Sequence, residues 1–271
     1  EKLGQAIELL LRHPSGGVRV FALEQLAEDR KDQASRQLET VFRGLKTHQA
    51  RQQAIRLAGR LKTGDSTTLL ETEFSRYLEE GRNRDIALEL SEAVRAIESL
   101  SNPAARLIER QKKKWSMQKD AFSLARFEVC LEGGDSQRGK RLFETGIDTQ
   151  CTRCHRVGRN GSTVGPKLDG IGKKRKPEAL LRSIVHPSAE IEKPYRTLLI
   201  GLVNGQTLSG VKIRETDDRL TLADAGGKTI QVSRADIEEL VVNRKSIMPE
   251  MAESLTLEKL RDLVAYLKSL Q

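Results

Sequence analysis

The sequence has few aromatic side chains, few cysteines and no long apolar run. Aromatic residues make up 4% of its 271 residues, and it contains three cysteines and four histidines. No stretch of about 18 consecutive apolar residues occurs, so the sequence predicts no membrane span. Nucleic-acid binding is disfavoured, because the basic clusters at 112–114 and 173–176 have almost no interleaved aromatic residues.

The remaining composition is that of a soluble protein with several small cores, with 37% hydrophobic and 31% charged residues. The length allows one large or two modest domains. The net charge of +9 is spread along the chain, so the basic clusters are either solvated surface or docking sites for an acidic partner. The chain opens at Glu1 without a charged-then-apolar leader, and we expect a processed or excised piece of a longer polypeptide.

The most informative stretch is Cys151-Thr152-Arg153-Cys154-His155. C-x-x-C-H is the attachment sequence of c-type haem: two thiols bond to the porphyrin, and the histidine binds the iron. A zinc site would need four nitrogen or sulfur ligands, and the only other cysteine is the isolated Cys130. A zinc site and a bare redox dithiol are the competing interpretations. For Cys130 we expect a buried, unreactive thiol, with an intermolecular disulfide or a redox role as alternatives.

Residues 1–130 show helical periodicity interrupted by glycine and proline clusters. A faint repeat begins at Arg19, Arg51 and Arg84, where alanine follows three residues later and an aliphatic residue comes next. These intervals of 32 and 33 residues predict stacked helical hairpins that resemble HEAT repeats, with an irregular helical bundle as the alternative. Helices over 104–118 and 120–130 are expected to form a charged connector.

The glycines after Glu132 predict a domain boundary. The sequence then predicts a short helix over 137–145, a helix beginning at Pro177 and a final amphipathic helix over about 256–270. Between the last two, β-type residues and the turn signals Asn204-Gly205 and Gly226-Gly227 predict five short strands in a small barrel or rolled antiparallel sheet.

The haem motif and its flanking helices resemble the class I cytochrome c family. Gly139 and Phe143 match the small and aromatic pair of the family's N-terminal helix, and Tyr266 lies in the segment that matches the crossing C-terminal helix. The resemblance implies that Tyr266 packs across Gly139 and that Phe143 lies beside the haem. We therefore expect a mainly α chain. Helical repeats occupy 1–132, and an all-α cytochrome c domain occupies 133–271, with its core at 133–194 and 243–271 and a β-rich insertion at 195–242.

The same resemblance implies the ligands. Pro166 matches the proline whose carbonyl accepts the Nδ1–H of the proximal His155, and Met248 matches the distal thioether ligand. Met248 lies 93 residues after His155, too far for a compact cytochrome domain, and the insertion accounts for the excess. This arrangement looks like the haem-binding domain of planctomycete and verrucomicrobial proteins. Met251 and His186 are the alternative distal ligands.

With both ligands retained, the iron would transfer single electrons and offer no position to a substrate, so we expect an electron carrier and not an enzyme. The alternative is a haem enzyme or gas sensor with an open distal site. We expect one haem c, a redox partner protein or dehydrogenase domain (acidic partners being favoured by the charge), no nucleic acid, and a periplasmic or equivalent extracytoplasmic location. The insertion is interpreted as a cover over one haem edge, with binding of a ligand or partner as the alternative.

Overall fold

The computed structural model describes residues 2–118 and 120–271, with side chains from residue 5 onwards. The chain divides into two compact units, Glu1–Gly133 and Gly134–Gln271, so that the boundary falls within a pair of glycines. Across the described residues, no helix is both long enough and apolar enough to cross a membrane.

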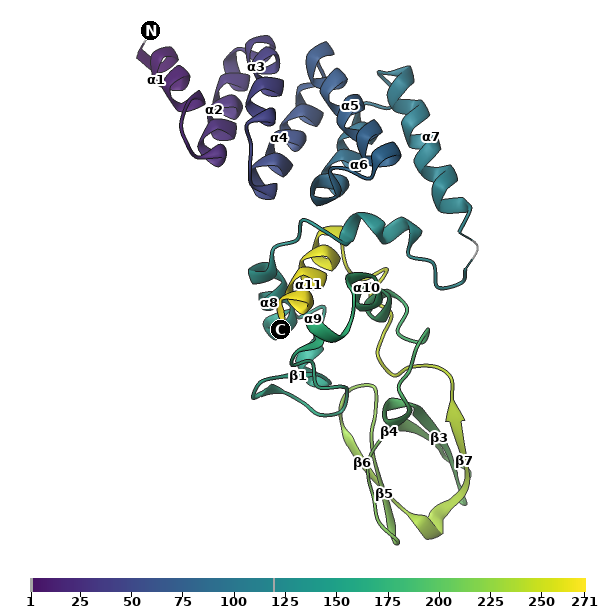
Figure 1. Ribbon diagram of the computed structural model, residues 1–271. Helices are drawn as coiled ribbons and strands as arrows, with labels where there is room; N and C mark the ends of the chain where they lie inside the picture. Colours follow the sequence, from purple (N-terminus) through teal and green to yellow (C-terminus); the bar gives the residue numbers. More distant parts are fainter. Residues whose placement is uncertain (1, 119) are drawn as a thin grey trace. The chain divides into compact units, whose positions relative to one another are not determined.

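The first unit consists of helices joined by short turns (Figure 1). Thr47 and Thr63 begin two of them by accepting a hydrogen bond from a backbone N–H three residues later, which satisfies a donor that the helix leaves unpaired. The elements are α1 (Lys2–Leu11), α2 (Gly16–Asp29), α3 (Lys31–Arg43), α4 (His48–Leu61), α5 (Gly64–Glu80), η1 (Arg84–Ile86), α6 (Ala87–Ala96), α7 (Asn102–Ser116) and η2 (Ala125–Cys130).

These helices pack as stacked hairpins. Each of α2 to α7 contacts its neighbour in the chain, and α2 contacts α4, α3 contacts α5, α4 contacts α6 and α5 contacts α7. The alanines of the pattern noted in the sequence, Ala22, Ala54 and Ala87, are each at most 1% exposed. A methyl side chain at this position lets two helices approach closely.

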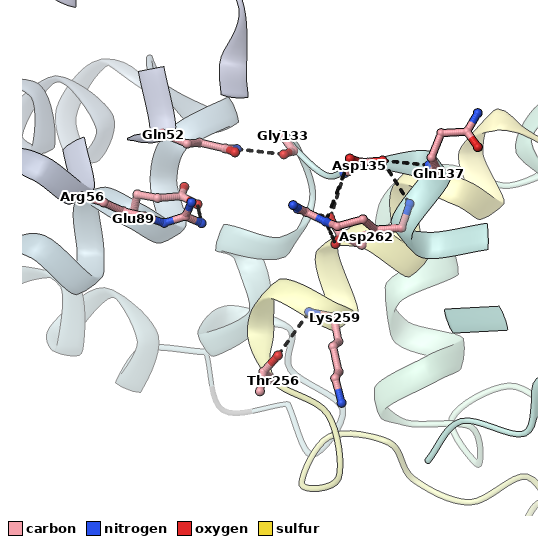
Figure 2. A network of polar contacts seen from close by, with 10 residues as sticks. Gln52, Arg56, Glu89, Gly133, Asp135, Gln137, Thr256, Lys259 and Asp262 are labelled. Carbon is pink, nitrogen blue, oxygen red and sulfur yellow. Dashed lines mark hydrogen bonds and ion pairs between the residues drawn. The ribbon is translucent and has the colours of Figure 1, made fainter. Parts of the chain in front are cut away.

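Polar side chains on α4 hold the segments that follow it. Gln52 donates from Nε2 to the carbonyl oxygens of Asp85 (2.9 Å) and Gly133 (2.8 Å), while Arg51 binds the Asp85 carboxylate at 2.7 Å. Figure 2 shows Gln52 reaching Gly133, and Arg56 paired with Glu89 at 2.9 Å. The two bonds from Gln52 satisfy half-buried backbone carbonyls, and together with the Arg51–Asp85 pair they hold the segment before α6 and the end of the unit.

The predicted helix over 120–130 is wrong for residues 120–124, and residues 125–130 form a 3₁₀ helix. Phe122 donates its backbone N–H to Oδ1 of Asp120, and Ala125 donates to Oγ of Ser123. These side-chain acceptors compete with helical hydrogen bonds and leave a turn followed by the 3₁₀ helix η2. Cys130, at the end of η2, is fully buried and forms no disulfide.

The second unit combines short helices with a separate β-sheet (Figure 1). The predicted helices at 137–145, at Pro177 and near 256–270 are confirmed within one or two residues. The elements are α8 (Ser136–Thr145), η3 (Cys151–Arg153), β1 (Arg156–Val157), β2 (Asn160–Gly161), α9 (Ile171–Lys174), α10 (Pro177–Val185), η4 (Lys193–Tyr195), β3 (Thr197–Leu202), β4 (Thr207–Glu215), β5 (Arg219–Ala223), β6 (Thr229–Ser233), η5 (Arg234–Asp236), β7 (Ile237–Asn243) and α11 (Leu257–Ser269).

Helices α8 and α11 cross in direct contact. A Cβ on Gly139 would lie 1.9 Å from the carbonyl oxygen of Asp262 and 2.8 Å from Cβ of Tyr266, so only glycine fits at the crossing. The Asp262 carboxylate accepts from the backbone N–H of Asp135 (2.8 Å) and from Nε of Arg138 (2.7 Å), as Figure 2 shows for Asp135. This charge-assisted pair raises the pKa of Arg138 and ties the first turn of α8 to α11.

The strands β3 to β7 form one antiparallel sheet in the order β6-β5-β4-β3-β7, which confirms the antiparallel segment predicted from the sequence. Figure 1 shows this sheet strongly curled, with β6 and β7 as its edges. Ile200, Leu220 and Leu222 are fully buried in its core. The first residue of β3, Thr197, pairs with the last residue of β7, Asn243, so the chain leaves the sheet beside the point where it entered.

Candidate haem site

The Cys-Thr-Arg-Cys-His motif forms a single tight turn after α8. Gln150 begins it with a left-handed backbone (φ 44°), and residues 151–153 form the 3₁₀ helix η3. The backbone N–H of His155 donates to the carbonyl of Cys151 at 2.8 Å, and that of Cys154 donates to the same oxygen at 3.2 Å. The turn therefore holds both cysteines and the histidine within one short piece of chain, and all three side chains are half-buried.

The imidazole of His155 is oriented by the segment that contains Pro166. Its Nδ1 lies 3.0 Å from the carbonyl oxygen of Pro166. A carbonyl can only accept, so Nδ1 carries the hydrogen and donates it, which leaves Nε2 of the neutral ring as a lone-pair donor for a metal. Burial lowers the pKa of His155, an effect that the Pro166 hydrogen bond partly opposes, and the neutral form is thereby favoured.

Gly165 makes this approach possible. A Cβ at this position would lie 2.9 Å from Cε1 and 3.1 Å from Nδ1 of His155, closer than a side chain tolerates. The backbone N–H of Gly165 also donates to the carbonyl of Cys154 at 2.7 Å. The Gly165-Pro166 peptide is therefore fixed against both the ring and the turn that carries it, and it orients the ring.

Neither Cys151 nor Cys154 forms a disulfide. Burial raises the pKa of both Cys151 and Cys154, so each carries its proton at neutral pH. Thr149 supports the first of them: its buried hydroxyl donates to the carbonyl of Leu142 at 2.5 Å and so joins the turn to the end of α8. Its hydrogen bond to Cys151 partly opposes the effect of burial on the pKa of that thiol.

The loop around the motif has almost no apolar core of its own. Between Phe143 and Leu180, Val164 is the only buried hydrophobic side chain. The loop is nevertheless closely hydrogen-bonded, with Ser162 donating to the carbonyl of Thr152 and Leu168 donating to that of Arg156. A defined loop without a core, two free thiols and an imidazole with Nε2 available fit a covalently bound haem, whose large apolar ring supplies the missing contacts.

The donor set does not fit zinc. Among residues 2–118 and 120–271, no three His, Cys, Asp or Glu side chains come together in a way that could hold a metal ion. Two thiols and one imidazole in this turn fall short of the four ligands of a structural zinc site.

The other predicted site residues lie in the same unit. Phe143 and Tyr266 are buried (3% and 5% exposed) with ring centroids 5.5 Å apart and ring planes inclined at 52°. Met248 is half-buried, whereas Met251 is 6% exposed, donates its backbone N–H to Ile184 and has Sδ 3.9 Å from the hydroxyl of Ser254.

His186, the third candidate for the distal position, ends α10. Its backbone N–H donates to the carbonyl of Arg182 at 2.7 Å, and its side chain is half-buried. The residue thus serves the helix terminus through its backbone, which is the structural role expected for a histidine directly before a proline.

The second unit thus combines short helices and a β-sheet with a turn that holds two cysteines and a histidine. Residues 136–199 match the family model for cytochrome c, so the second unit contains a cytochrome c domain. This match supports a c-type haem protein that carries electrons. No curated protein matches the chain.

Three supporting residues were missed by the sequence analysis. Gly165 and Thr149 act through close approach and a backbone hydrogen bond, which composition does not reveal. Asp224, in the β5–β6 turn, acts electrostatically on Cys154 and raises the pKa of that thiol further. The only signal for this third residue was its place beside the Gly226-Gly227 turn, and nothing in the sequence linked that turn to the haem motif.

Proposed function

We propose that the chain is a one-electron carrier with a single haem c bound through Cys151 and Cys154, and with His155 and Met248 as axial ligands. The observation that carries this proposal is the hydrogen bond from Nδ1–H of His155 to Pro166, because it presents Nε2 beside two unpaired thiols. Haem iron bound by histidine and methionine favours the ferrous state and cycles by one electron.

Burial supports Met248 over Met251 as the distal ligand. A side chain that binds haem iron has to be accessible from the haem side. Met248 is half-buried and leaves part of its side chain accessible, whereas Met251 is covered by protein. Met251 is packed against α10 through Ile184, and the Ser254 hydroxyl approaches its sulfur. The Met248 backbone N–H donates to Oγ of Ser246 at 3.1 Å, which shapes the turn that presents its thioether.

The protein side chains would hold and tune the iron, and no residue of the site is assigned a proton-transfer or nucleophilic role. Pro166 and Gly165 orient the imidazole, while Phe143 and Tyr266 provide apolar packing at the α8–α11 crossing. Because both ligands come from the protein and stay bound, little has to rearrange when an electron moves, which suits fast transfer and leaves no place for a substrate.

The optical spectrum of the ferric protein tests this assignment. Wild type should show the weak long-wavelength sulfur-to-iron band, Met248→Ala should lose it, and Met251→Ala should keep it. Ferrous wild type should also resist carbon monoxide, while Met248→Ala should bind it. A high-spin wild type that binds carbon monoxide would instead favour the haem enzyme or gas sensor. If the band of wild type persists in Met248→Ala and is lost in Met251→Ala, the ligand is Met251.

The surroundings of the site favour a larger redox assembly. The segment 151–196 carries 11 basic and 4 acidic residues, so this part of the second unit suits an acidic redox partner or dehydrogenase domain. The stacked hairpins of the first unit suit a HEAT-like scaffold for such a partner. Because c-type haem is attached outside the bacterial cytoplasmic membrane in the family that the chain resembles, we place the protein in the periplasm or an equivalent compartment.

A further inference from the structure

The tip of the β5–β6 hairpin lies against the haem-attachment turn. A Cβ on Gly227 would lie 3.2 Å from the carbonyl oxygen of Arg153 and 3.9 Å from Cβ of Arg153, the residue between Thr152 and Cys154. These two segments are more than 70 positions apart in the chain. The sheet is thus not a free appendage, because one of its turns rests on the peptide that carries the second cysteine.

The shape of this tip is set by Asp224. Its Oδ1 accepts from the backbone N–H of Gly226 and of Lys228, both at 2.9 Å, and its carbonyl accepts from the N–H of Gly227 at 2.9 Å. The turn gives Gly227 a left-handed backbone (φ 79°), which glycine adopts without strain. The Asp224 carboxylate is therefore held in a fixed, half-buried position close to the haem-attachment turn.

The charge of Asp224 reaches the site. Its carboxylate accepts from the residues on either side of Gly227, and Gly227 is the residue that contacts the Arg153 carbonyl, so the charge is held next to the attachment turn. A negative charge near a haem stabilises the ferric form relative to the ferrous form, because the ferric iron carries one more positive charge.

We propose that the β5–β6 hairpin is a positioning element of the haem site: Gly227 seats it on the Arg153 carbonyl and holds the attachment turn, and the fixed charge of Asp224 lowers the reduction potential. The part of this inference that concerns the potential rests on the proposed function, whereas the contact between hairpin and turn does not. The β insertion is thereby assigned a role in tuning the site, through two residues of one turn.

Replacing Asp224 by asparagine tests the charge. Asn keeps an Oδ1 acceptor for the N–H groups of Gly226 and Lys228, so the turn survives while the charge is removed. At a fixed ambient potential, spectroelectrochemistry should show the ratio of ferrous to ferric protein about threefold higher in Asp224→Asn than in wild type. Asp217→Asn, which removes an exposed charge from the β4–β5 turn, is the matched control and should leave the ratio unchanged.

Replacing Gly227 by asparagine tests the contact. Asn tolerates a left-handed backbone, so the turn can form, but its side chain would collide with the Arg153 carbonyl. Gly205, in the β3–β4 turn, has nearly the same φ (80°) and nothing within 4 Å of an added Cβ, which makes Gly205→Asn the matched control. Hydrogen exchange of the backbone amides of 151–155 should become faster in Gly227→Asn and stay at the wild-type rate in Gly205→Asn.

The outcomes separate this inference from the proposed function. Pyridine haemochrome analysis first shows whether haem is attached. If it is absent, the proposed function fails, and the exchange experiment still decides whether the hairpin holds the turn. If haem is attached but Asp224→Asn and Asp217→Asn have the same potential, or if Gly227→Asn and Gly205→Asn exchange alike, the positioning role is overturned while the electron-carrier proposal stands.

Discussion

The helical unit and the haem loop bury apolar side chains in opposite ways. In the helical unit, buried hydrophobic residues recur along each helix from α2 to α7. In the loop between α8 and α10, Val164 is the single such residue. The first region is held by its own packing, whereas the second is held by hydrogen bonds and close backbone approaches. The shape of the haem loop therefore depends on its backbone contacts, while that of the helical unit depends on its side chains.

Removal of the two haem-motif thiols should have the largest effect. Cys151→Ser combined with Cys154→Ser should abolish covalent haem, since no thiol remains to bond to the porphyrin. Mass spectrometry under denaturing conditions should find only the bare polypeptide, and calorimetry should show a lower transition for the second unit and an unshifted one for the helical unit. Cys130→Ser is the control and should keep its haem. A shift of both transitions would show that the units depend on one another.

A cavity in the helical unit should have the next largest effect, a loss of stability of that unit. Leu70 is fully buried in α5, and Leu70→Ala should lower the free energy of unfolding of that unit by about 2–5 kcal/mol. The haem spectrum should remain that of wild type, because the site draws on residues of the second unit alone. Denaturant titration followed by circular dichroism and by haem absorbance separates the two effects. A haem spectrum that changes together with the helical signal would contradict the independence of the two regions.

Overpacking at the α8–α11 crossing should destabilise the second unit by a similar amount. In Gly139→Ala the added methyl would overlap the Asp262 carbonyl, so the helices must move apart, at a cost of about 2–3 kcal/mol. Gly64→Ala, in the first turn of α5 with nothing within 4 Å of its Cβ, should cost nothing. Denaturant unfolding of the second unit, followed by haem absorbance, measures the difference. Equal stabilities of the two variants would mean that α8 and α11 do not cross at Gly139.

The smallest effect should come from the cap of α8. The backbone N–H groups of Arg138 and then Gln137 lower the pKa of Asp135, because they bind its charged form. The stability gained is complete above the ordinary carboxylate pKa of about 4, and it is lost as the pH falls through the lower folded value. Asp135→Ala should cost about 1 kcal/mol at pH 7 and less at pH 3.

The melting temperature of the second unit, measured from pH 7 down to pH 3, tests this expectation. Asp135→Asn keeps an acceptor at the cap without a titrating group, so it should differ from wild type less than Asp135→Ala does and should lack this part of the pH dependence. A stability difference between wild type and Asp135→Ala that grows on acidification would reverse the sign and disprove the linkage.

Patterns among neighbouring residues predicted most of the helices and strands. Helical periodicity and the turn dipeptide Asn204-Gly205 are properties of neighbouring residues, and the helices and strands that they predicted are present. Residues 120–124 were misjudged because the side chains of Asp120 and Ser123 accept backbone hydrogen bonds in place of helical carbonyls, a competition that periodicity does not detect.

The candidate site was only partly predictable for the same reason. Cys151, Cys154 and His155 belong to one contiguous motif, so haem attachment could be predicted from the sequence alone. The roles of Gly165 and Gly227 depend on contacts with the imidazole and with the Arg153 carbonyl, which exist only after the chain has folded. The sequence shows that both glycines lie in turns, but it does not show which residue each one contacts.

The pairing of Thr197 with Asn243 has a consequence for how such a chain could arise. A segment whose first and last residues are neighbours changes the contour length of a polypeptide while leaving the gap that it bridges almost unchanged. Residues can therefore be added or removed between these two positions without a change in the distance between the flanking segments. Of the 93 positions that separate Met248 from His155, those between Thr197 and Asn243 therefore add length to the chain and bring it back to the strand end where it began.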